Sequence, residues 1–401
     1  MSGMNQTPSS ERVHIGFFGK RNAGKSSVMN AVTGQELAVV SDVLGTTTDP
    51  VSKSMELLPL GPVVMIDTPG IDDEGELGAL RVKKSYQVLN KVDIAVLVVD
   101  VRTGVGAEEA ALIERFEAKK IPYLVVYNKM DLAAHTAENG EKNLYVSALT
   151  KKGIAELKEA IARLAAASEP EKRIVGDRLE KGDLVILVVP IDKAAPKGRL
   201  ILPQQQTIRD ILDAGAVSMV VRDEELELLY QNMPMKPAMV ITDSQAFGKV
   251  AKATPKEIPL TSFSILFANY KGNLAQAVAG VSALNTLEAG SKILISEGCT
   301  HHRQCGDIGT VKLPAWIREY TGKDFEFHTT SGTEFPEDLT PYRLIIHCGG
   351  CMLNEREMKY RLKCAQDQGV PMTNYGIAIA YMKGILKRSL QIFPEIAVLL
   401  N

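Results

Sequence analysis

The sequence has 401 residues, of which 45% are hydrophobic and 23% are charged, and its formal net charge is −2. This length exceeds one ordinary hydrophobic core and favours two or three domains. The near-neutral charge argues against a nucleic-acid partner, and the polar N-terminus and short apolar runs argue against a signal or a membrane span, so we expect a cytoplasmic protein.

Residues 13–167 alternate short β-branched apolar runs with helix-like segments. This alternation is typical of βα units on a mostly parallel sheet. The expected strands are "VHIGFFG", "VVMIDTPG", "IAVLVVD", "YLVVYNK" and "NLYVSA". The charged segment 167–183 contains proline and glycine. We therefore predict a first α/β domain over residues 1–172.

A second alternation follows, with expected strands "LVILVVPI", "VSMVV", "AMVITDS" and "FSILFA", the last at 263–268. Helix-like segments such as "QQQTIRDILDAG" and "EELELLYQNM" separate them. This stretch has no cysteine and no phosphate loop, so a structural role at a subunit interface is the simplest interpretation. We predict a small α/β domain over residues 173–268.

The third unit covers residues 269–401 and begins with a helix of small residues, "GNLAQAVAGVSALNTL". Two expected strands, "KILISEG" and "YRLIIH", each run directly into a cluster of cysteine and histidine. Functional sites in α/β sheets gather at the carboxyl ends of the strands. We therefore expect the two clusters to converge.

The segment "GKRNAGKS" (19–26) fits the phosphate-loop pattern and lies between an expected strand and an expected helix. Glycines let backbone N–H groups surround the phosphates, Lys25 can reach the β and γ oxygens, and Ser26 can bind Mg²⁺. After a later strand, "DTPG" (67–70) puts Asp67 on the Mg²⁺ side and the N–H of Gly70 near a γ-phosphate.

The base is indicated by "NKMD" (128–131) and "SAL" (147–149), which follow two further strands. The two carboxylate oxygens of Asp131 match the paired N–H donors of guanine, while Asn128 and Lys129 brace the loop. The expected ligand is GTP with Mg²⁺. The residues expected to bind it are Gly19, Asn22, Ala23, Gly24, Lys25, Ser26, Ser27, Thr47, Asp67, Gly70, Asn128, Lys129, Asp131, Ser147 and Ala148.

These motifs resemble the translation-factor class of GTPases, especially the branch that contains Era and the tRNA-modifying GTPase MnmE. In that branch "GTTTD" (45–49) looks like switch I, which makes Thr47 the candidate Mg²⁺ ligand, with Thr46 as the alternative. Ile71 stands where Ras-like GTPases carry a water-orienting glutamine, so we expect slow hydrolysis. The resemblance implies that potassium bound beside Asn22 stimulates it. The expected catalytic residues are Lys25, Asn22, Thr47 and Gly70.

Four of the five cysteines lie in two short clusters. The pattern is C-x-H, then forty-five residues, then H-C-x-x-C, formed by Cys299, His301, His347, Cys348 and Cys351. Three thiolates suit either an iron–sulfur cluster or zinc, and the chemistry alone leaves both open. We expect Cys305 to be a free thiol and Cys364 to pack within a helix.

A phosphate-loop GTPase followed by this cysteine–histidine pattern resembles the HydF family of [FeFe]-hydrogenase maturation GTPases. The resemblance implies an α/β chain with a GTPase domain, a dimerisation domain and a cluster-binding domain. It implies a homodimer whose Cys299, Cys348 and Cys351 hold a [4Fe–4S] cluster, with His301 or His347 as a fourth ligand or neighbour. It further implies a scaffold that receives a two-iron precursor built with HydE and HydG and delivers it to apo-[FeFe]-hydrogenase.

Three other interpretations stay open at this point. A redox- or metal-sensing switch would use the metal site to control hydrolysis without transferring a cluster. A tRNA-modifying GTPase of the MnmE kind is disfavoured, because we expect a further domain before its phosphate loop. A third interpretation treats GTP as a structural ligand, and steady turnover would dismiss it.

Overall fold

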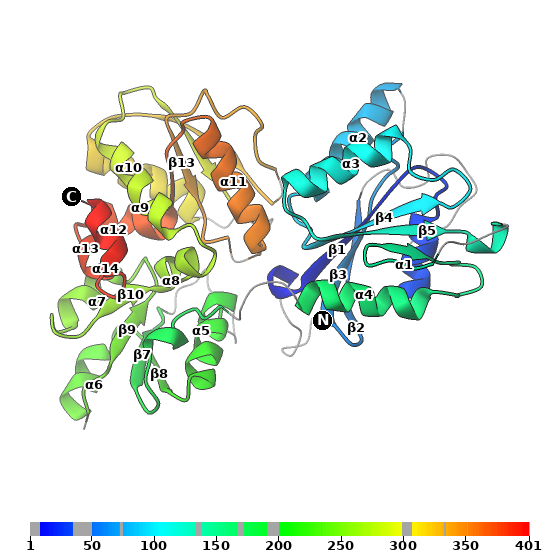
Figure 1. Ribbon diagram of the computed structural model, residues 1–401. Coiled ribbons are helices and arrows are strands. Elements are labelled where there is room, and N and C mark those ends of the chain that lie inside the picture. The colour runs from blue at the N-terminus through cyan, green and yellow to red at the C-terminus, as the bar shows by residue number, and fades with distance from the viewer. Residues whose placement is uncertain are drawn as a thin grey trace. The chain divides into compact units, whose positions relative to one another are not determined.

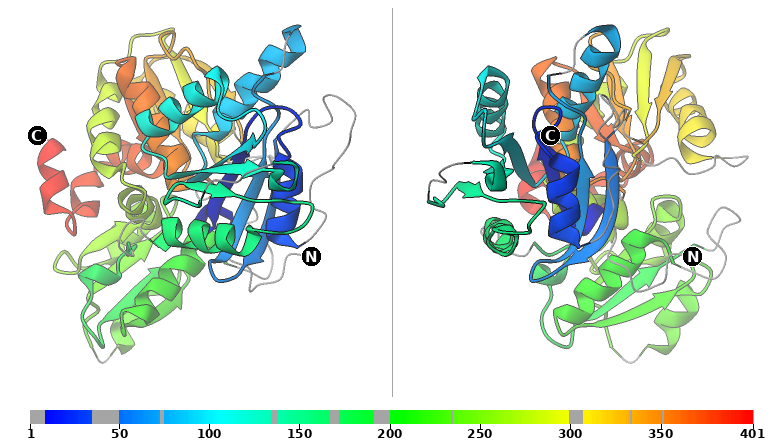
Figure 2. Two further views of the ribbon diagram at one scale, coloured as in Figure 1. Left: turned by 45° about the vertical axis from the view of Figure 1, so that its right-hand side comes forward. Right: turned by 90° about the vertical axis from the view of Figure 1, so that its right-hand side faces the viewer.

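The computed structural model divides into two compact units, Met1–Pro170 and Glu171–Asn401 (Figures 1 and 2). The switch I threonines, Cys299, His301, Cys305 and Cys351 lie outside the described residues. Within the described part of the chain, no helix combines the length and apolarity needed to cross a bilayer. The described residues are 9–34, 50–72, 75–133, 138–166, 172–190, 200–233, 235–298, 307–332, 334–350 and 352–400.

The first unit contains a six-stranded sheet in the order β2-β3-β1-β4-β5-β6. All its pairs are parallel except β2–β3, which is antiparallel. The sequence patterns had not indicated β2, whose residues are mostly exposed. The strands are β1 (Val13–Phe18), β2 (Val51–Leu57), β3 (Gly61–Asp67), β4 (Ile94–Asp100), β5 (Tyr123–Asn128) and β6 (Asn143–Tyr145).

Alternate side chains of this sheet supply two hydrophobic cores, one on each face. Ile15 and Phe17 pack with α1 and α4 on one face, whereas Phe18 packs with α2 and α3 on the other. The carboxyl ends of β1, β3 and β5 therefore present the three nucleotide motifs at one edge. The helices are α1 (Lys25–Thr33), α2 (Gly75–Val88), α3 (Ala107–Ala118) and α4 (Ile154–Ala166), with short turns η1 (Ser9–Glu11) and η2 (Met130–Leu132).

The second unit contains two four-stranded sheets, in the orders β10-β9-β7-β8 and β12-β11-β13-β14. Every strand pair in both sheets is parallel. The strands of the first are β7 (Leu184–Val188), β8 (Val217–Val221), β9 (Met239–Thr242) and β10 (Leu260–Ser262). Those of the second are β11 (Lys292–Ser296), β12 (Glu326–Thr330), β13 (Leu344–His347) and β14 (Met372–Asn374).

One hydrophobic core joins the two sheets of this unit. It includes Val185 and Ile241 of the first sheet, Ile293 and Ile346 of the second, and buried residues of α5, α8, α9, α10 and α12. The outer faces have cores of their own: α6 and α7 cover the first sheet and α11 covers the second. Residues from the second and third predicted segments, 173–268 and 269–401, therefore share a core within one packed unit.

The helices of the second unit connect its parallel strands and close its C-terminal end. They are α5 (Leu202–Asp213), α6 (Leu226–Asn232), α7 (Phe247–Ala253), α8 (Phe263–Tyr270), α9 (Leu274–Val281), α10 (Leu313–Thr321), α11 (Glu355–Asp367), α12 (Tyr375–Met382), α13 (Leu386–Ser389) and α14 (Pro394–Ala397). Short turns are η3 (Gly176–Arg178), η4 (Ser282–Asn285), η5 (Ile308–Lys312) and η6 (Val398–Leu400).

The expected strand at 263–268 is wrong, because these residues form α8. The strand β10 ends at Ser262, whose side chain caps the helix by accepting a hydrogen bond from the backbone N–H of Ile265 at 3.3 Å. An apolar run buried on all sides shows no period that separates a helix from a strand. Ser262, a residue type that favours the start of a helix, was the signal in the sequence that could have indicated α8.

Candidate functional site

The phosphate loop follows β1 and leads into α1, as its motif requires. The ammonium group of Lys25 is buried and donates to the carbonyl oxygens of Gly19 and Lys20 at 3.0 and 2.8 Å. Gly24 adopts φ +90°, and a Cβ atom there would lie 2.3 Å from Asn128 Nδ2. The glycine is therefore required by close packing between the phosphate loop and the "NKMD" loop.

Ser26 and Asp67 form a paired oxygen site beside this loop. The hydroxyl of Ser26 donates to Asp67 Oδ2 at 2.5 Å. Burial raises the pKa of Asp67, whereas Ser26 and Lys25 act to lower it. Among the described residues, no group hydrogen-bonds the buried Oδ1 of Asp67. A hydroxyl and an unsatisfied carboxylate oxygen fit Mg²⁺, which prefers oxygen ligands and would supply positive charge to bound phosphates.

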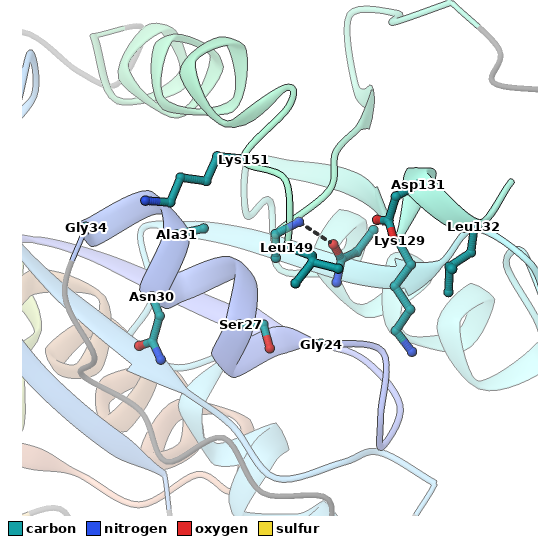
Figure 3. A pocket seen from close by; sticks show the side chains of 12 residues that line it. Gly24, Ser27, Asn30, Ala31, Gly34, Lys129, Asp131, Leu132, Leu149 and Lys151 are labelled. Carbon is teal, nitrogen blue, oxygen red and sulfur yellow. Dashed lines mark hydrogen bonds between the residues drawn. The ribbon is translucent and has the colours of Figure 1, made fainter.

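A pocket of about 710 Å³ lies where α1 meets the loops after β5 and β6 (Figure 3). Asn128 connects its walls, because Nδ2 donates to the carbonyl of Ala23 at 3.0 Å and Oδ1 accepts from the N–H of Ala148 at 3.1 Å. The lining residues are Gly24, Ser27, Asn30, Ala31, Gly34, Asn128, Lys129, Asp131, Leu132, Ala148, Leu149 and Lys151. The pocket is continuous with the phosphate loop, as a nucleoside site would be.

The two charged residues of "NKMD" are held by neighbours. Lys129 Nζ donates to the carbonyl oxygen of Asn22 at 2.5 Å and to Asp100 Oδ2 at 2.8 Å. Hydrogen bonds from Arg102, together with Lys129, hold the pKa of Asp100 far below its usual range. Asp131 Oδ1 accepts from the hydroxyl of Ser147 at 2.5 Å. The sequence motifs did not indicate the bracing role of Asp100.

The "DTPG" segment contacts the phosphate loop directly. A Cβ atom at Gly70 would lie 2.5 Å from Arg21 Cγ, and the backbone N–H of Arg21 donates to Asp72 Oδ1 at 2.7 Å. Ile71 is buried in the core with α2 and α3, so residue 71 offers no polar group to a water molecule. Asn22 has φ 59° and is exposed. Sequence reasoning missed the link between Arg21 and Asp72, since the phosphate-loop pattern leaves the residue type at position 21 open and Asp72 lies outside the motifs.

In the second unit, the two cysteine segments meet at the carboxyl ends of β11 and β13. The Cys348 sulfur accepts N–H hydrogen bonds from Gly298 at 3.0 Å and Gly350 at 3.4 Å. Gly298 directly precedes Cys299, so the described residues bring the two segments into contact. The chain reverses its strand order between β11 and β13, and such a point favours a site. Over the described ranges, no three potential metal ligands gather.

The other histidines and cysteines of this region differ in their surroundings. His347 is buried, with Nδ1 2.7 Å from the carbonyl oxygen of Cys348 and Nε2 3.1 Å from Arg361 Nη1. Cys364 is half-buried on α11 and packs against the outer core. His328 lies on β12 and contacts Glu326 and Tyr342. Nothing in the sequence singled out Arg361, because one arginine in an amphipathic helix is ordinary.

Three protein-family models match successive parts of the chain, and each matched part contains most or all of the strands of one of the three sheets. Residues 14–129 match the 50S ribosome-binding GTPase family. Residues 174–272 match the hydrogen maturase F dimerization domain, and residues 275–392 match the hydrogen maturase F tetramerization domain. The two hydrogen maturase F matches together span more than half of the chain.

Similar proteins with known names match the GTPase region. The tRNA modification GTPase MnmE of Chromobacterium violaceum is 32% identical over 169 residues, covering 41% of this chain and 37% of its own. MnmE of Laribacter hongkongensis is 34% identical over 156 residues, covering 38% and 34%. The chain thus spans about a third of the length of these relatives. A structure of Era with MgGDPNP and nucleotides 1506-1542 of 16S ribosomal RNA is 20% identical, with a TM-score of 0.35, covering 57% of this chain and 91% of its own.

The fold of the first unit and its GTPase match define a phosphate-loop GTPase, which hydrolyses GTP. The two following matches specify the kind of GTPase. The chain belongs to the hydrogen maturase F family, whose GTPases act in hydrogenase maturation, and its dimerization and tetramerization domains indicate an oligomer.

Proposed function

We propose that this protein is a GTP-hydrolysing scaffold that binds a [4Fe–4S] cluster and delivers a two-iron precursor to apo-[FeFe]-hydrogenase. The observation that supports it best is the hydrogen bond from the N–H of Gly298 to the Cys348 sulfur at 3.0 Å. It connects the residue before Cys299 with the first thiol of the C-x-x-C pair. Cys299, Cys348 and Cys351 are the proposed ligands.

The surroundings of Cys348 fit a metal-bound thiolate. Two backbone N–H groups donate to its sulfur, and such donors stabilise negative charge on it. A bound [4Fe–4S] cluster would supply an iron with no thiolate ligand, where an outside group can be exchanged. We propose His301 as a candidate neighbour or ligand of that iron, and HydE and HydG as the source of the precursor.

In the GTPase unit, we propose that Lys25 and Gly70 contact the phosphates, Ser26, Asp67 and Thr47 bind Mg²⁺, and the "NKMD" and "SAL" loops bind guanine. The unpaired Asp67 oxygen and the pocket beside Asp131 support these assignments. We further propose that K⁺ binds beside Asn22 and supplies charge during hydrolysis.

We propose a homodimer that forms along β8. This strand lies at the edge of its sheet and pairs with β7 alone among the described strands. Two of its residues, Val217 and Val220, are apolar and 51% and 43% exposed. An exposed apolar edge strand is a template for pairing with another chain, which agrees with the dimerization-domain match over residues 174–272.

The scaffold function can be tested by anaerobic reconstitution with iron and sulfide, followed by loading with a synthetic two-iron compound and incubation with apo-hydrogenase. Transfer of iron and appearance of hydrogen evolution are expected. A protein that binds the cluster, yet transfers nothing while its GTP turnover follows the redox state, would instead be the sensing switch.

Asp131→Asn should reduce the preference for GTP. One acceptor becomes an N–H₂ donor, which opposes the donors of guanine and suits the 2-carbonyl of xanthine. A bidentate base contact is worth about 1–3 kcal/mol, so we expect about a 5- to 150-fold loss of GTP affinity. Competition binding with GTP and XTP measures the change. Unaltered GTP affinity would show that Asp131 does not contact the base.

Turnover should be slow in sodium and faster in potassium, and Asn22→Ala should remove most of the difference. A bound cation supplies charge that residue 71 cannot replace, because Ile71 is apolar and buried. Phosphate release measured in both chloride salts tests this. Equal wild-type rates in the two salts would leave Asn22 as an ordinary loop residue.

A further inference from the structure

Arg361 of α11 is completely buried, with 0% of its surface exposed. Its Nε donates to Glu357 Oε1, one helical turn earlier, at 3.0 Å. The ring of Phe335 lies 5.1 Å from its guanidinium carbon. A buried charge is stable only when it is paired and hydrogen-bonded. The hydrogen bonds of its other donors, Nη1 and Nη2, are therefore needed to stabilise this buried charge.

Those donors reach three neighbouring strands at their carboxyl ends. Nη1 donates to Ser296 Oγ, at the end of β11, at 3.2 Å, and Nη2 donates to the carbonyl oxygen of Gly332, after β12, at 2.8 Å. Nη1 also lies 3.1 Å from Nε2 of His347, at the end of β13. Ser296 and His347 are register partners across the two strands. One side chain thus holds together the strand ends that lead into both cysteine segments.

The contact with Arg361 determines the tautomer of His347. A guanidinium has donors and no acceptor, so Nε2 of His347 must accept and carries no hydrogen. The hydrogen lies on Nδ1, which donates to the carbonyl oxygen of Cys348 at 2.7 Å. Both ring nitrogens are thereby occupied in a side chain that is only 1% exposed. A metal ion would have to displace one of these hydrogen bonds to bind the ring.

A second buried cation holds the far end of the same segment. Lys271, between α8 and α9, donates through Nζ to the carbonyl oxygens of Gly350 and Leu353. Gly350 has φ +61°, which favours glycine, and Lys271 is buried. The described residues 347–350 and 352–353, before and after Cys351, are therefore held by protein contacts that need no metal.

We propose that Arg361 and His347 are positioning residues for the cluster site, and that His347 is not a ligand of the cluster. Arg361 orients the imidazole, and the imidazole fixes the backbone carbonyl of Cys348. The Cys348 sulfur is then kept within reach of the N–H groups of Gly298 and Gly350. This inference rests on the proposed cluster binding, and it assigns separate roles to the two histidines of the motif.

The first test asks whether His347 touches iron. Protein labelled with ¹⁵N-histidine is reconstituted anaerobically as wild type and as His347→Gln, which keeps an acceptor for Arg361. Pulsed EPR of the reduced cluster should give the same g values in both proteins. If the wild type shows a coupling to a histidine nitrogen, His347→Gln should show the same coupling. A coupling that is present in the wild type and lost in His347→Gln would overturn the inference.

The second test measures cluster retention as the rate of iron release to a chelator. Arg361→Lys keeps the charge and loses the fork that serves several acceptors. Loss of an outer hydrogen bond to a metal ligand typically costs about 10- to 100-fold in affinity, and we expect a loss in that range. Matched controls are Arg356→Lys, half-buried on the same helix, and His328→Gln on β12, both expected to behave like the wild type.

The outcomes separate this inference from the proposed function. Wild-type protein that binds no iron would refute cluster binding itself. With iron bound, wild-type release rates in folded Arg361→Lys would overturn the positioning role. If Arg361→Lys does not fold, as judged by thermal melting, His347→Gln decides: faster release with unchanged EPR supports the proposal, and wild-type release refutes it.

Discussion

Replacing Cys348 with serine is expected to abolish [4Fe–4S] binding, and Cys299→Ser and Cys351→Ser should do the same. Each change removes a thiolate from a set of three, and a serine hydroxyl is a poor ligand for iron–sulfur clusters because it stays protonated near neutral pH. Iron and acid-labile sulfide analysis after anaerobic reconstitution, with EPR of the reduced protein, measures the loss. GTP hydrolysis should survive in all three variants.

The matched control is Cys364→Ser, because this cysteine is half-buried on α11 and packs with the outer core of the sheet. It should retain a full cluster. Two results would contradict the assignment of ligands: reconstituted wild type that holds zinc and no iron, or loss of the cluster on substitution of Cys305.

Lys25→Ala is expected to lower the rate of GTP hydrolysis by at least about 100-fold, the usual effect of removing one charge-stabilising donor from a transition state. Lys25 lies close enough to Asp67 to lower the pKa of that carboxyl group. When GTP binds, we expect the ammonium group of Lys25 to exchange its hydrogen bonds to the carbonyl oxygens of Gly19 and Lys20 for contacts with phosphate oxygens. Single-turnover phosphate release at saturating GTP measures this step.

Lys119→Ala provides the control for that change. Lys119 follows α3, and its ammonium group contacts Asn90 at an exposed position, so wild-type hydrolysis is expected. Near-normal phosphate release by Lys25→Ala would mean that another cation occupies the phosphate site.

The sequence was most informative where local spacing is itself the structural requirement. The phosphate loop, "DTPG" and "NKMD" each had to follow a strand, and β1, β3 and β5 end at those motifs. Short β-branched apolar runs identified buried strands such as β4, whereas the mostly exposed β2 had no such signal. The apolar run at 263–268 failed as a predictor because a short apolar run has no period that separates a helix from a strand.

Long-range contacts account for the rest of what the sequence did not indicate. Arg361 reaches Ser296, which is 65 residues away, and Lys271 reaches Gly350, which is 79 residues away. Their importance arises from the registration of strands and from burial. A linear pattern contains neither property, so no motif predicts such residues.

The core shared by the two sheets of the second unit has a consequence for how this part of the chain folds. Val185, Ile241, Ile293 and Ile346 belong to one hydrophobic cluster, although they come from segments that match separate family domains. Cutting the chain between those segments would expose apolar surface on both fragments. The segments from 174 to 392 are thus expected to melt as one cooperative unit, so that a destabilising change in either sheet weakens both.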